Sequence, residues 1–396
     1  MKARRKSNVK ADGLIHNLNN YAQVNLTHMI ADVKQLVELE SPSRDKQAVD
    51  RCGEYVAKRF ADLGGKVKIH RNRDFGNQLQ IDFPAAKKGT RPILLLGHYD
   101  TVWDVGTLAK MPIRESKGRL SGPGVFDMKA GIAIALYAIK ALQDSQGELP
   151  HPVTILLNPD EEIGSPVSRS VTEQLAKKSA AVLVLEPSQG PDGKVKTSRK
   201  GVGDFAVKVT GVSAHAGLDF TKGQNAVLEL ANQIVRIGQF TDLAKGLTVS
   251  VGEVTGGSPA TNVVPASAEA KFDVRIAQAK DGPVIERKFR SLRAVNRKCT
   301  LEVTGGINRP PLERTKAVAA LYELARDIYA ELGCELGEAA VGGGSDGNFT
   351  GALGIPTLDG LGPVGEGAHA SNESIIVSEL PKRVALLAGL ISRIEP

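Results

Sequence analysis

The 396-residue sequence predicts an α/β protein in which a mostly parallel-sheet domain carries a smaller inserted α+β domain. Two observations predict this. Short apolar runs, typical of strands buried on both faces, alternate with segments of helical periodicity. Near residue 203 the order changes to β-α-β-β-α-β, and the earlier alternation resumes after residue 309. The expected domains are therefore 1–202 with 310–396, and 203–309 as the insert.

The larger domain opens with helical periodicity over 26–40 and 47–63. Strand-like segments follow at 66–71 and 77–83. Apolar runs at 92–97, 153–158 and 181–185 predict central parallel strands, with a helix at 129–145 between the first two. After the insert, helices and strands are expected in alternation at 313–332, 335–341, 355–358 and 378–394.

The insert is expected to be a split ferredoxin-like unit. Its expected elements are, in order, strand 204–210, helix 223–239, strands 248–254 and 263–274, helix 282–297 and strand 299–305. Asn308-Arg309-Pro310-Pro311 is expected to form a stiff linker back to the larger domain.

Composition excludes several classes of protein. The 51 basic and 44 acidic residues give a net charge of +7, partly from Met1–Lys6, which is expected to be a solvated end. Aromatic residues make up 4% of the chain, so base-stacking platforms are not expected, and we expect no nucleic-acid partner. The positive net charge is expected to attract small anionic substrates mildly. No apolar stretch is long enough for a membrane span, and we see no signal peptide. Three scattered cysteines fit a reducing compartment, so we expect a cytoplasmic protein.

Polar side chains follow each of the three apolar strands. His98 and Asp100 follow the first, Asp160-Glu161-Glu162 the second, and Glu186 the third. In open α/β sheets, ligands bind beyond the carboxyl ends of the strands, so these residues should meet at one edge. Taken singly, each has a plainer interpretation, such as a hydrogen-bonded structural histidine or a solvated acidic turn.

Two glycine-containing loops add further candidates. Asp127 ends the loop that begins at Ser121, where it could also simply cap the following helix, and His369 lies between glycines and small residues near the C-terminus. Two histidines with three carboxylates are a ligand set for a carboxylate-bridged pair of metal ions, most plausibly zinc. One further carboxylate beside them would supply a general base.

Taken together, these motifs resemble a known family, the dinuclear zinc amidohydrolases. That family includes acetylornithine deacetylase, succinyl-diaminopimelate desuccinylase and the bacterial glutamate carboxypeptidases. The sequence is most similar to the folate-hydrolysing glutamate carboxypeptidases, from about residue 30 to the end. The motifs that carry the resemblance stand in the family's order: Gly97–Val102, Gly122–Lys129, Asp160-Glu161-Glu162, Leu185-Glu186-Pro187 and Gly342–Asp346.

The resemblance implies a role for each of these residues. Asp127 would bridge two zinc ions, with Co²⁺ or Mn²⁺ as possible substitutes. His98 and Glu186 would complete one metal position, and Glu162 and His369 the other. It further implies that Asp100 orients His98 and that the Asp127–Met128 peptide is cis. Glu161 would be the general base that takes a proton from water and passes it to the leaving amine.

The resemblance also implies roles for residues in and near the insert. His215 would be an oxyanion donor delivered from the partner subunit of a homodimer, although its spacing alone favours an ordinary loop histidine. Asn262 would reach the substrate. Arg275 would bind a substrate carboxylate, with Arg309 as a weaker second candidate. Gly343 and Gly344 offer backbone amides to a substrate or simply form a tight turn.

The expected protein is a homodimeric zinc metallopeptidase whose insert acts as lid and dimerisation domain. It would hydrolyse an amide bond and release a C-terminal amino acid, with glutamate the favoured product. An N-acyl-amino-acid deacylase resembling acetylornithine deacetylase is the alternative. A more remote alternative is a non-catalytic metal- or peptide-binding protein, against which Glu161 beside a full ligand set argues.

Overall fold

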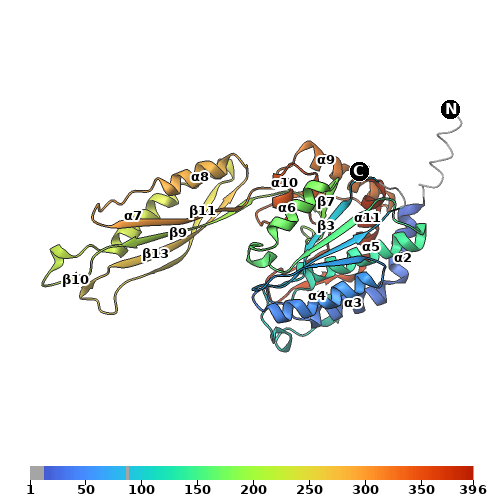
Figure 1. Ribbon diagram of the computed structural model, residues 1–396, viewed down its shortest axis with the longest axis horizontal. Coiled ribbons are helices and arrows are strands. Elements are labelled where there is room, and N and C mark those ends of the chain that lie inside the picture. Colours follow the sequence, from blue (N-terminus) through green and yellow to red (C-terminus); the bar gives the residue numbers. More distant parts are fainter. Residues whose placement is uncertain (1–12, 86–88, 396) are drawn as a thin grey trace. The chain divides into compact units, whose positions relative to one another are not determined.

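The computed structural model describes residues 13–85 and 89–395, so the basic segment Met1–Lys6 lies outside the described residues. The chain divides into two compact units (Figure 1). Unit 1 comprises the chain up to Ser198, Arg314–Ala340 and the chain from Ser345 onward. Unit 2 comprises Arg199–Glu313 and Val341–Gly344, a short stretch that the sequence analysis placed in the larger domain.

The centre of unit 1 is a six-stranded sheet in the order β1-β2-β6-β3-β7-β16. The pairings β3–β6, β3–β7 and β7–β16 are parallel, whereas β1–β2 and β2–β6 are antiparallel. This confirms the mostly parallel sheet predicted from the apolar runs. The strands are β1 (Lys66–His70), β2 (Gln78–Phe83), β3 (Ile93–His98), β6 (Val153–Asn158), β7 (Ala181–Val184) and β16 (Thr357–Leu358).

Helices cover both faces of this sheet (Figure 1). On β3, Ile93 and Leu95 face the larger core cluster, whereas Leu94 and Leu96 face a smaller cluster with Ala176. The larger cluster takes residues from α2 (Leu14–Val24), α3 (Leu26–Glu38), α4 (Lys46–Ala61), α5 (Ala130–Gln146), α9 (Lys316–Glu331) and α11 (Leu380–Arg393). On the other face lie α6 (Arg169–Lys178) and α10 (Gly347–Ala352). Successive side chains of a strand point to opposite faces of the sheet. A strand that is apolar throughout therefore needs a helical layer on each face.

Two small sheets complete unit 1. One has the order β17-β18-β5-β4 and joins the loop of Asp127 to the loop of His369. In the other, β8 (Val195–Arg199) pairs with β15 (Glu338–Val341). The strands of the first are β4 (Arg114–Ser116), β5 (Arg119–Ser121), β17 (Gly365–Glu366) and β18 (Ser374–Ile376).

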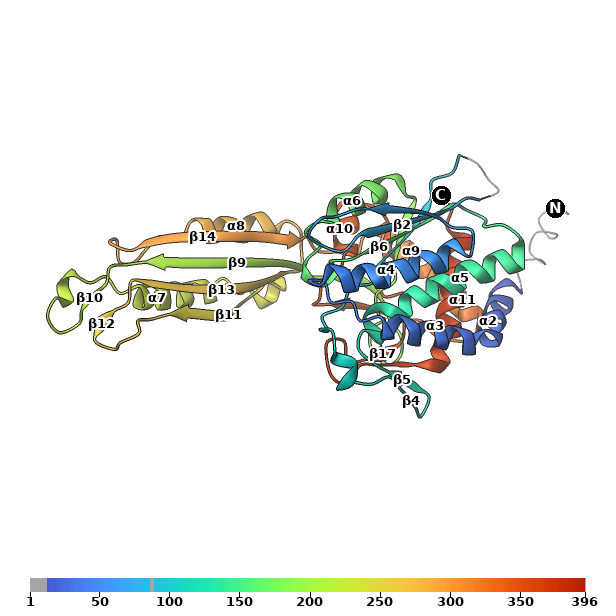
Figure 2. The same cartoon turned by 60° about the horizontal axis from the view of Figure 1, so that its bottom comes forward.

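Unit 2 has its own antiparallel sheet, in the order β11-β13-β9-β14 (Figure 2). Its strands are β9 (Gly201–Thr210), β11 (Thr248–Gly256), β13 (Ser267–Ile276) and β14 (Thr300–Arg309), and its helices are α7 (Ala226–Gly238) and α8 (Asp281–Arg290). Alternate residues of β9, such as Phe205 and Val207, are buried in a separate core. Phe205 stacks on Phe289 of α8 with ring centroids 4.0 Å apart. A separate antiparallel-sheet domain is thereby confirmed.

Three expected boundaries in unit 2 were wrong. The helix expected over 282–297 ends at Arg290, because the chain beyond it turns to donate the Val295 and Asn296 N–H groups to the Glu229 carboxylate. The strand expected over 263–274 is split into β12 (Val263–Val264), which pairs with β10 (Ala214–His215), and β13. Pro265 lies between the two strands. Because proline has no N–H to donate to a sheet ladder, it interrupts the expected strand. Strand β14 continues through Arg309 into the expected linker.

Two further points concern helices. The helix α2 was missed, because its Asn-rich sequence has only Ile15, Leu18 and Ala22 as buried positions. None of the helices in residues 13–85 and 89–395 has the length and apolarity that crossing a membrane requires.

Candidate metal centre

Three neighbouring strands deliver the polar residues to one edge of the unit 1 sheet. His98 is the last residue of β3, and Glu186 lies two residues beyond β7. Glu161 and Glu162 begin a short 3₁₀ turn (Glu161–Ile163) after β6. Because β3 is parallel to both β6 and β7, the carboxyl ends of all three strands lie at the same edge.

Asp127 lies between two histidines, with one carboxylate oxygen toward each. His98 Nε2 is 3.2 Å from Asp127 Oδ1, and His369 Nε2 is 3.3 Å from Asp127 Oδ2. Each histidine has a second carboxylate beside it: His98 Nε2 is 3.3 Å from Glu186 Oε1, and His369 Nε2 is 3.1 Å from Glu162 Oε2. The five predicted ligands thus form two clusters that share Asp127.

The donor atoms of these clusters fit metal ions. His98 Nε2 and Asp127 Oδ1 are buried, and neither has a partner in hydrogen-bond geometry. Buried polar atoms are normally satisfied, so two facing orphaned ligand atoms indicate a shared cation. Within the described residues, His98, Asp127 and Glu162 form one group with ligand atoms within 4.8 Å of one another, and His98, Glu161 and Glu186 form another.

The electrostatics of the cluster also favour a cation. Burial lowers the pKa of His98, but its contacts with Asp100, Asp127 and Glu186 outweigh burial and hold that pKa well above its usual value. The hydrogen bond with Asp127, followed by that with Glu162, raises the pKa of His369 to about 11. Burial and the negative charge of Asp127 raise the pKa of Glu162 to about 7. The metal-free cluster therefore holds protons where divalent ions would otherwise balance the carboxylates.

Asp100 lies where it can orient His98. Its side-chain Oδ1 is 3.3 Å from His98 Nδ1, and its backbone oxygen is 3.1 Å from the same nitrogen. The carboxylate also accepts hydrogen bonds from Ser43 Oγ at 2.6 Å and from the backbone N–H groups of Glu161 and Glu162 at 3.2 Å each. With Nδ1 donating to Asp100, His98 Nε2 is left as the metal-facing lone pair.

Glu161 and Glu162 differ in position although they are adjacent. Glu162 contacts His369, whereas the Glu161 carboxylate lies within 4.8 Å of ligand atoms of His98 and Glu186. Glu161 is 8% exposed. Distance alone therefore allows Glu161 to act either as a ligand or as a base beside the ligands.

The turn that carries Asp127 has two backbone features. The Asp127–Met128 peptide is cis, as the family resemblance implies, and Gly124 has a φ of 73°. Glu373, to which the sequence analysis gave no role, accepts hydrogen bonds from this turn. Its position four residues after His369 was visible in the sequence, but nothing there indicated that the two loops meet.

His215 lies in unit 2, on β10, and is exposed. Its Nδ1 accepts hydrogen bonds from the Gly217 and Leu218 N–H groups, each at 3.1 Å. The proton of the neutral ring therefore resides on Nε2, which makes that atom a donor. Nε2 lies 3.4 Å from Asn262 Nδ2, so two of the predicted substrate residues are brought together, and with the Asn262 amide turned over its oxygen would accept the Nε2 proton.

The predicted anion-binding arginine already has a partner. Arg275 contacts Asp273 through both Nε and Nη2, at 2.8 and 2.7 Å, and its Nη1 is 3.5 Å from the Gly342 carbonyl oxygen. A substrate carboxylate would have to share this guanidinium with Asp273.

The remaining substrate candidates also lie in unit 2. The carbonyl groups of Gly343 and Gly344 accept hydrogen bonds from Arg199, at 3.2 and 3.1 Å. The sequence analysis gave Arg199 no role. Arg309 is 8% exposed at the end of β14.

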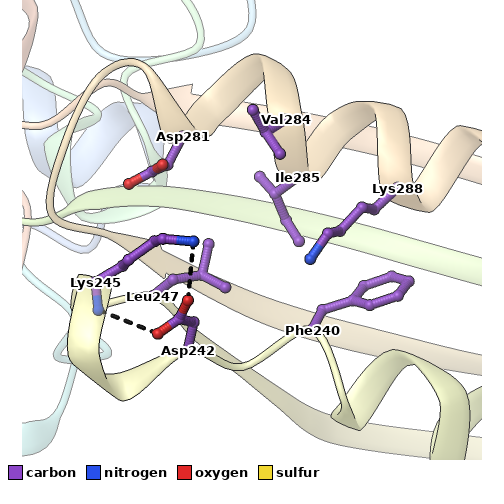
Figure 3. Close-up of a pocket in the computed structure, with 8 residues that line it drawn as sticks. All are labelled: Phe240, Asp242, Lys245, Leu247, Asp281, Val284, Ile285 and Lys288. Carbon is purple, nitrogen blue, oxygen red and sulfur yellow. Dashed lines mark hydrogen bonds and ion pairs between the residues drawn. The ribbon is translucent and has the colours of Figure 1, made fainter.

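A separate hollow in unit 2 does not resemble a substrate site (Figure 3). Its volume is about 40 Å³, which holds no more than a few water molecules. Its charged residues include Asp242 and Lys245, which pair with each other at 3.0 Å. We therefore interpret Asp242 and Lys245 as an ordinary surface ion pair and assign no function to this hollow.

The chain is similar to several known proteins. Carboxypeptidase G2 from Pseudomonas sp. (strain RS-16) is 30% identical over 369 residues, which cover 92% of this chain and 88% of that protein. Succinyl-diaminopimelate desuccinylase from Dechloromonas aromatica is 26% identical over 364 residues, covering 87% and 93%. A solved Bacillus subtilis protein described as a dinuclear metal binding peptidase matches with a TM-score of 0.69 and 17% identity, covering 93% and 98%.

The sequence model of peptidase family M20/M25/M40 matches residues 94–393. That range includes both histidines and every carboxylate of the two clusters. The enzyme is thus a metallo-hydrolase of peptide or amide bonds, of a family with a dinuclear metal site. The resemblance inferred from the strand-end motifs is confirmed: the chain belongs to peptidase family M20/M25/M40.

Proposed function

We propose that the protein is a dizinc carboxypeptidase that removes a C-terminal amino acid, with glutamate the favoured leaving residue. The observation that carries the metal assignment is Asp127, with one oxygen 3.2 Å from His98 and the other 3.3 Å from His369. Asp127 would bridge the two ions. His98 with Glu186, and His369 with Glu162, would complete the two positions.

Two bound zinc ions would supply Lewis acidity, polarising the scissile carbonyl group and lowering the pKa of water. The protein's own residues would transfer protons, orient a ligand and stabilise the oxyanion. Glu161 takes a proton from the attacking water and gives it to the leaving amine. Asp100 holds His98 in the tautomer with a free Nε2. His215, whose Nε2 is a donor, would stabilise the oxyanion from the partner subunit.

Specificity for a free carboxylate would come from Arg275. Arginine suits this role because its planar fork binds a carboxylate through two hydrogen bonds. Asp273 at 2.7 Å holds the guanidinium in place and would share it with the substrate. The likeness to Carboxypeptidase G2 supports a carboxypeptidase. The glutamate preference rests on the resemblance of the sequence motifs to those of the bacterial glutamate carboxypeptidases.

The alternative is N-acyl-amino-acid deacylation. The likeness to succinyl-diaminopimelate desuccinylase favours it, at lower identity but similar coverage. The same metal chemistry serves both reactions, so only the substrate decides between them.

We also propose a homodimer formed through unit 2. Within the described part of its sheet, β11 is an edge strand that pairs only with β13. Exposed apolar side chains lie on β11 and on α7: Val251, Val254, Leu228 and Val235, between 40% and 68% exposed. An unprotected apolar edge favours pairing with another chain, and a second copy would bury it symmetrically.

A panel of substrates on zinc-loaded protein tests the proposed specificity. It should contain dipeptides and N-acyl amino acids ending in glutamate, in neutral residues or in ornithine, each as free acid and as amide. We expect cleavage of glutamate-terminated acids, loss of activity on the amides, and a much smaller acid–amide difference in Arg275→Ala. Preference for N-acetylornithine would favour the deacylase, and equal cleavage of acid and amide would exclude carboxylate recognition.

A further inference from the structure

A buried carboxylate that takes no part in the proposed chemistry joins two loops of the metal centre. Glu373 is 0% exposed, and each of its oxygens accepts two hydrogen bonds. Oε1 accepts from the N–H groups of Phe126 and Asp127, at 2.9 and 3.0 Å. Oε2 accepts from the Gly124 N–H at 2.9 Å and from the Trp103 indole Nε1 at 2.8 Å. Burial raises the pKa of Glu373, whereas these four donors favour its ionised form.

Three of these donors belong to the turn that ends at Asp127. Neighbouring N–H groups that point at one anion form a concave site, and the anion in turn stabilises the turn in that conformation. The last of the three is the N–H of Asp127 itself. The backbone position of the proposed bridging ligand is therefore set by Glu373.

Glu373 itself belongs to the second of the two loops, the one that carries His369. His369 has a φ of 61°, which is uncommon for a residue other than glycine. A Cβ on Gly367 would lie 2.8 Å from the Glu373 N atom, and this N–H donates to the Ala370 carbonyl at 3.0 Å. The segment from Gly367 to Glu373 is thus tightly wound, so that fixing Glu373 also fixes His369.

We propose that Glu373 is a positioning residue that sets the separation of Asp127 and His369, and thereby the affinity of the metal position that these two residues share with Glu162. This inference rests on the proposed metal centre. Glutamine at this position would direct its NH₂ group at backbone N–H donors, leaving at least one donor without an acceptor. The two ligand loops would then be free to separate.

The protein carries its own reporter of this arrangement. Trp103 is the single tryptophan of the chain, and its indole N–H donates to Glu373. Metal ions that bind Asp127 and His369 should change the surroundings of Glu373, and hence the fluorescence of Trp103.

The test compares Glu373→Gln with Glu366→Gln after removal of bound metal. Glu366 ends β17, directly before the segment from Gly367 to Glu373, but it is exposed and pairs with Arg119, so it is the matched control. Zinc alone is titrated in competition with a chromophoric chelator, while Trp103 emission is recorded. In wild type and the control we expect two zinc ions per chain and a saturable change in emission. In Glu373→Gln we expect one site weakened about 10- to 100-fold and the emission change lost.

Unchanged affinity at both sites in folded Glu373→Gln would overturn the inference. Failure of the wild type to bind zinc would instead overturn the metal centre, and the role of Glu373 with it, so the two failures are distinct. If Glu373→Gln does not fold, Glu373→Asp takes its place, because it keeps the charge but withdraws the carboxylate by one methylene. We expect one site weakened there too, and wild-type affinity would overturn the inference.

Discussion

Glu161 and Glu162 differ in position rather than in residue type, and we propose different roles for them on that ground. Both are glutamates in one short turn, and Asp100 accepts the backbone N–H of each. Glu162 lies 3.1 Å from His369, whereas Glu161 faces the His98 and Glu186 side of the cluster. A base must lie beside the ligands without being consumed by metal binding, and we assign that role to Glu161, as proposed above, although its distance to His98 and Glu186 would also fit a ligand.

We predict that Glu161→Gln lowers kcat by about 10²- to 10⁴-fold, because the proton acceptor is removed, while both metal ions stay bound. Glu162→Gln is the control and should lose metal from one position. Turnover and metal content per chain are measured on the same preparations. Loss of metal from Glu161→Gln would show that the two glutamates have the opposite roles.

A second prediction at this scale concerns pH. The pKa of His98 and that of His369 are raised by their carboxylate neighbours, and the pKa of Glu162 is raised to about 7. At pH 7.5 the metal-free His369 is therefore protonated, the pKa of His98 is shifted in the same direction, and zinc must displace protons from the cluster. We expect the binding of two zinc ions to release about two protons and the affinity to fall as the pH is lowered. Calorimetry in buffers of different ionisation enthalpy measures the release, and a heat independent of buffer would contradict it.

At the scale of elements, the metal centre depends on how closely α5 approaches the end of β7. Gly131, on α5, has no room for a side chain: a Cβ there would lie 2.3 Å from the Leu185 carbonyl oxygen. Leu185 immediately precedes Glu186. Gly131 is the second residue of α5, where close packing against Leu185 leaves no room for a larger residue.

We predict that Gly131→Ala destabilises the protein by about 1–3 kcal/mol, since the overlap exceeds the gain in helix propensity. It should also weaken zinc binding, because the strand end that carries Glu186 must move. Gly238→Ala is the control: it lies on α7 with open space around its Cβ position, so we expect no loss of stability. Denaturant unfolding followed by circular dichroism compares the two. Equal stability of both variants would contradict the packing argument.

At the scale of the whole molecule, each unit has its own hydrophobic core, and the chain passes between the two units at four points. The proposed metal ligands all belong to unit 1, whereas His215, Asn262 and Arg275 belong to unit 2. The proposed homodimer gives this division a function, because residues of one chain's unit 2 would complete the partner's site.

Mixed dimers test this sharing. His215→Ala and Glu161→Gln should each be nearly inactive alone, through loss of the oxyanion donor and of the base. In a mixed dimer with shared sites, one of the two sites is wild type. Random reassortment makes about half of the dimers mixed, so we expect activity to return to roughly a quarter of that of wild type. Co-expression with two affinity tags isolates the heterodimer. No recovery there would mean that His215 does not act across the dimer.

The sequence by itself determined most of the metal centre. His98, Glu162 and Glu186 follow buried strands, and the carboxyl ends of parallel strands must meet at one edge, so their proximity follows from strand order alone. The apolar runs likewise predicted the parallel sheet, because only a strand covered on both faces is apolar throughout. The family resemblance then assigned the roles, including the cis peptide at Asp127.

Only the tertiary structure decided which loops touch. Glu373 and Gly124 are far apart in sequence, and their hydrogen bond depends on the whole chain between them. The same holds for Glu229, whose carboxylate ends α8 early by binding the N–H groups of Val295 and Asn296. The periodicity of apolar residues in the sequence indicates which face of a helix or strand is buried. It does not indicate which distant residue a polar side chain will contact. Such partners are fixed only when segments distant in sequence pack together.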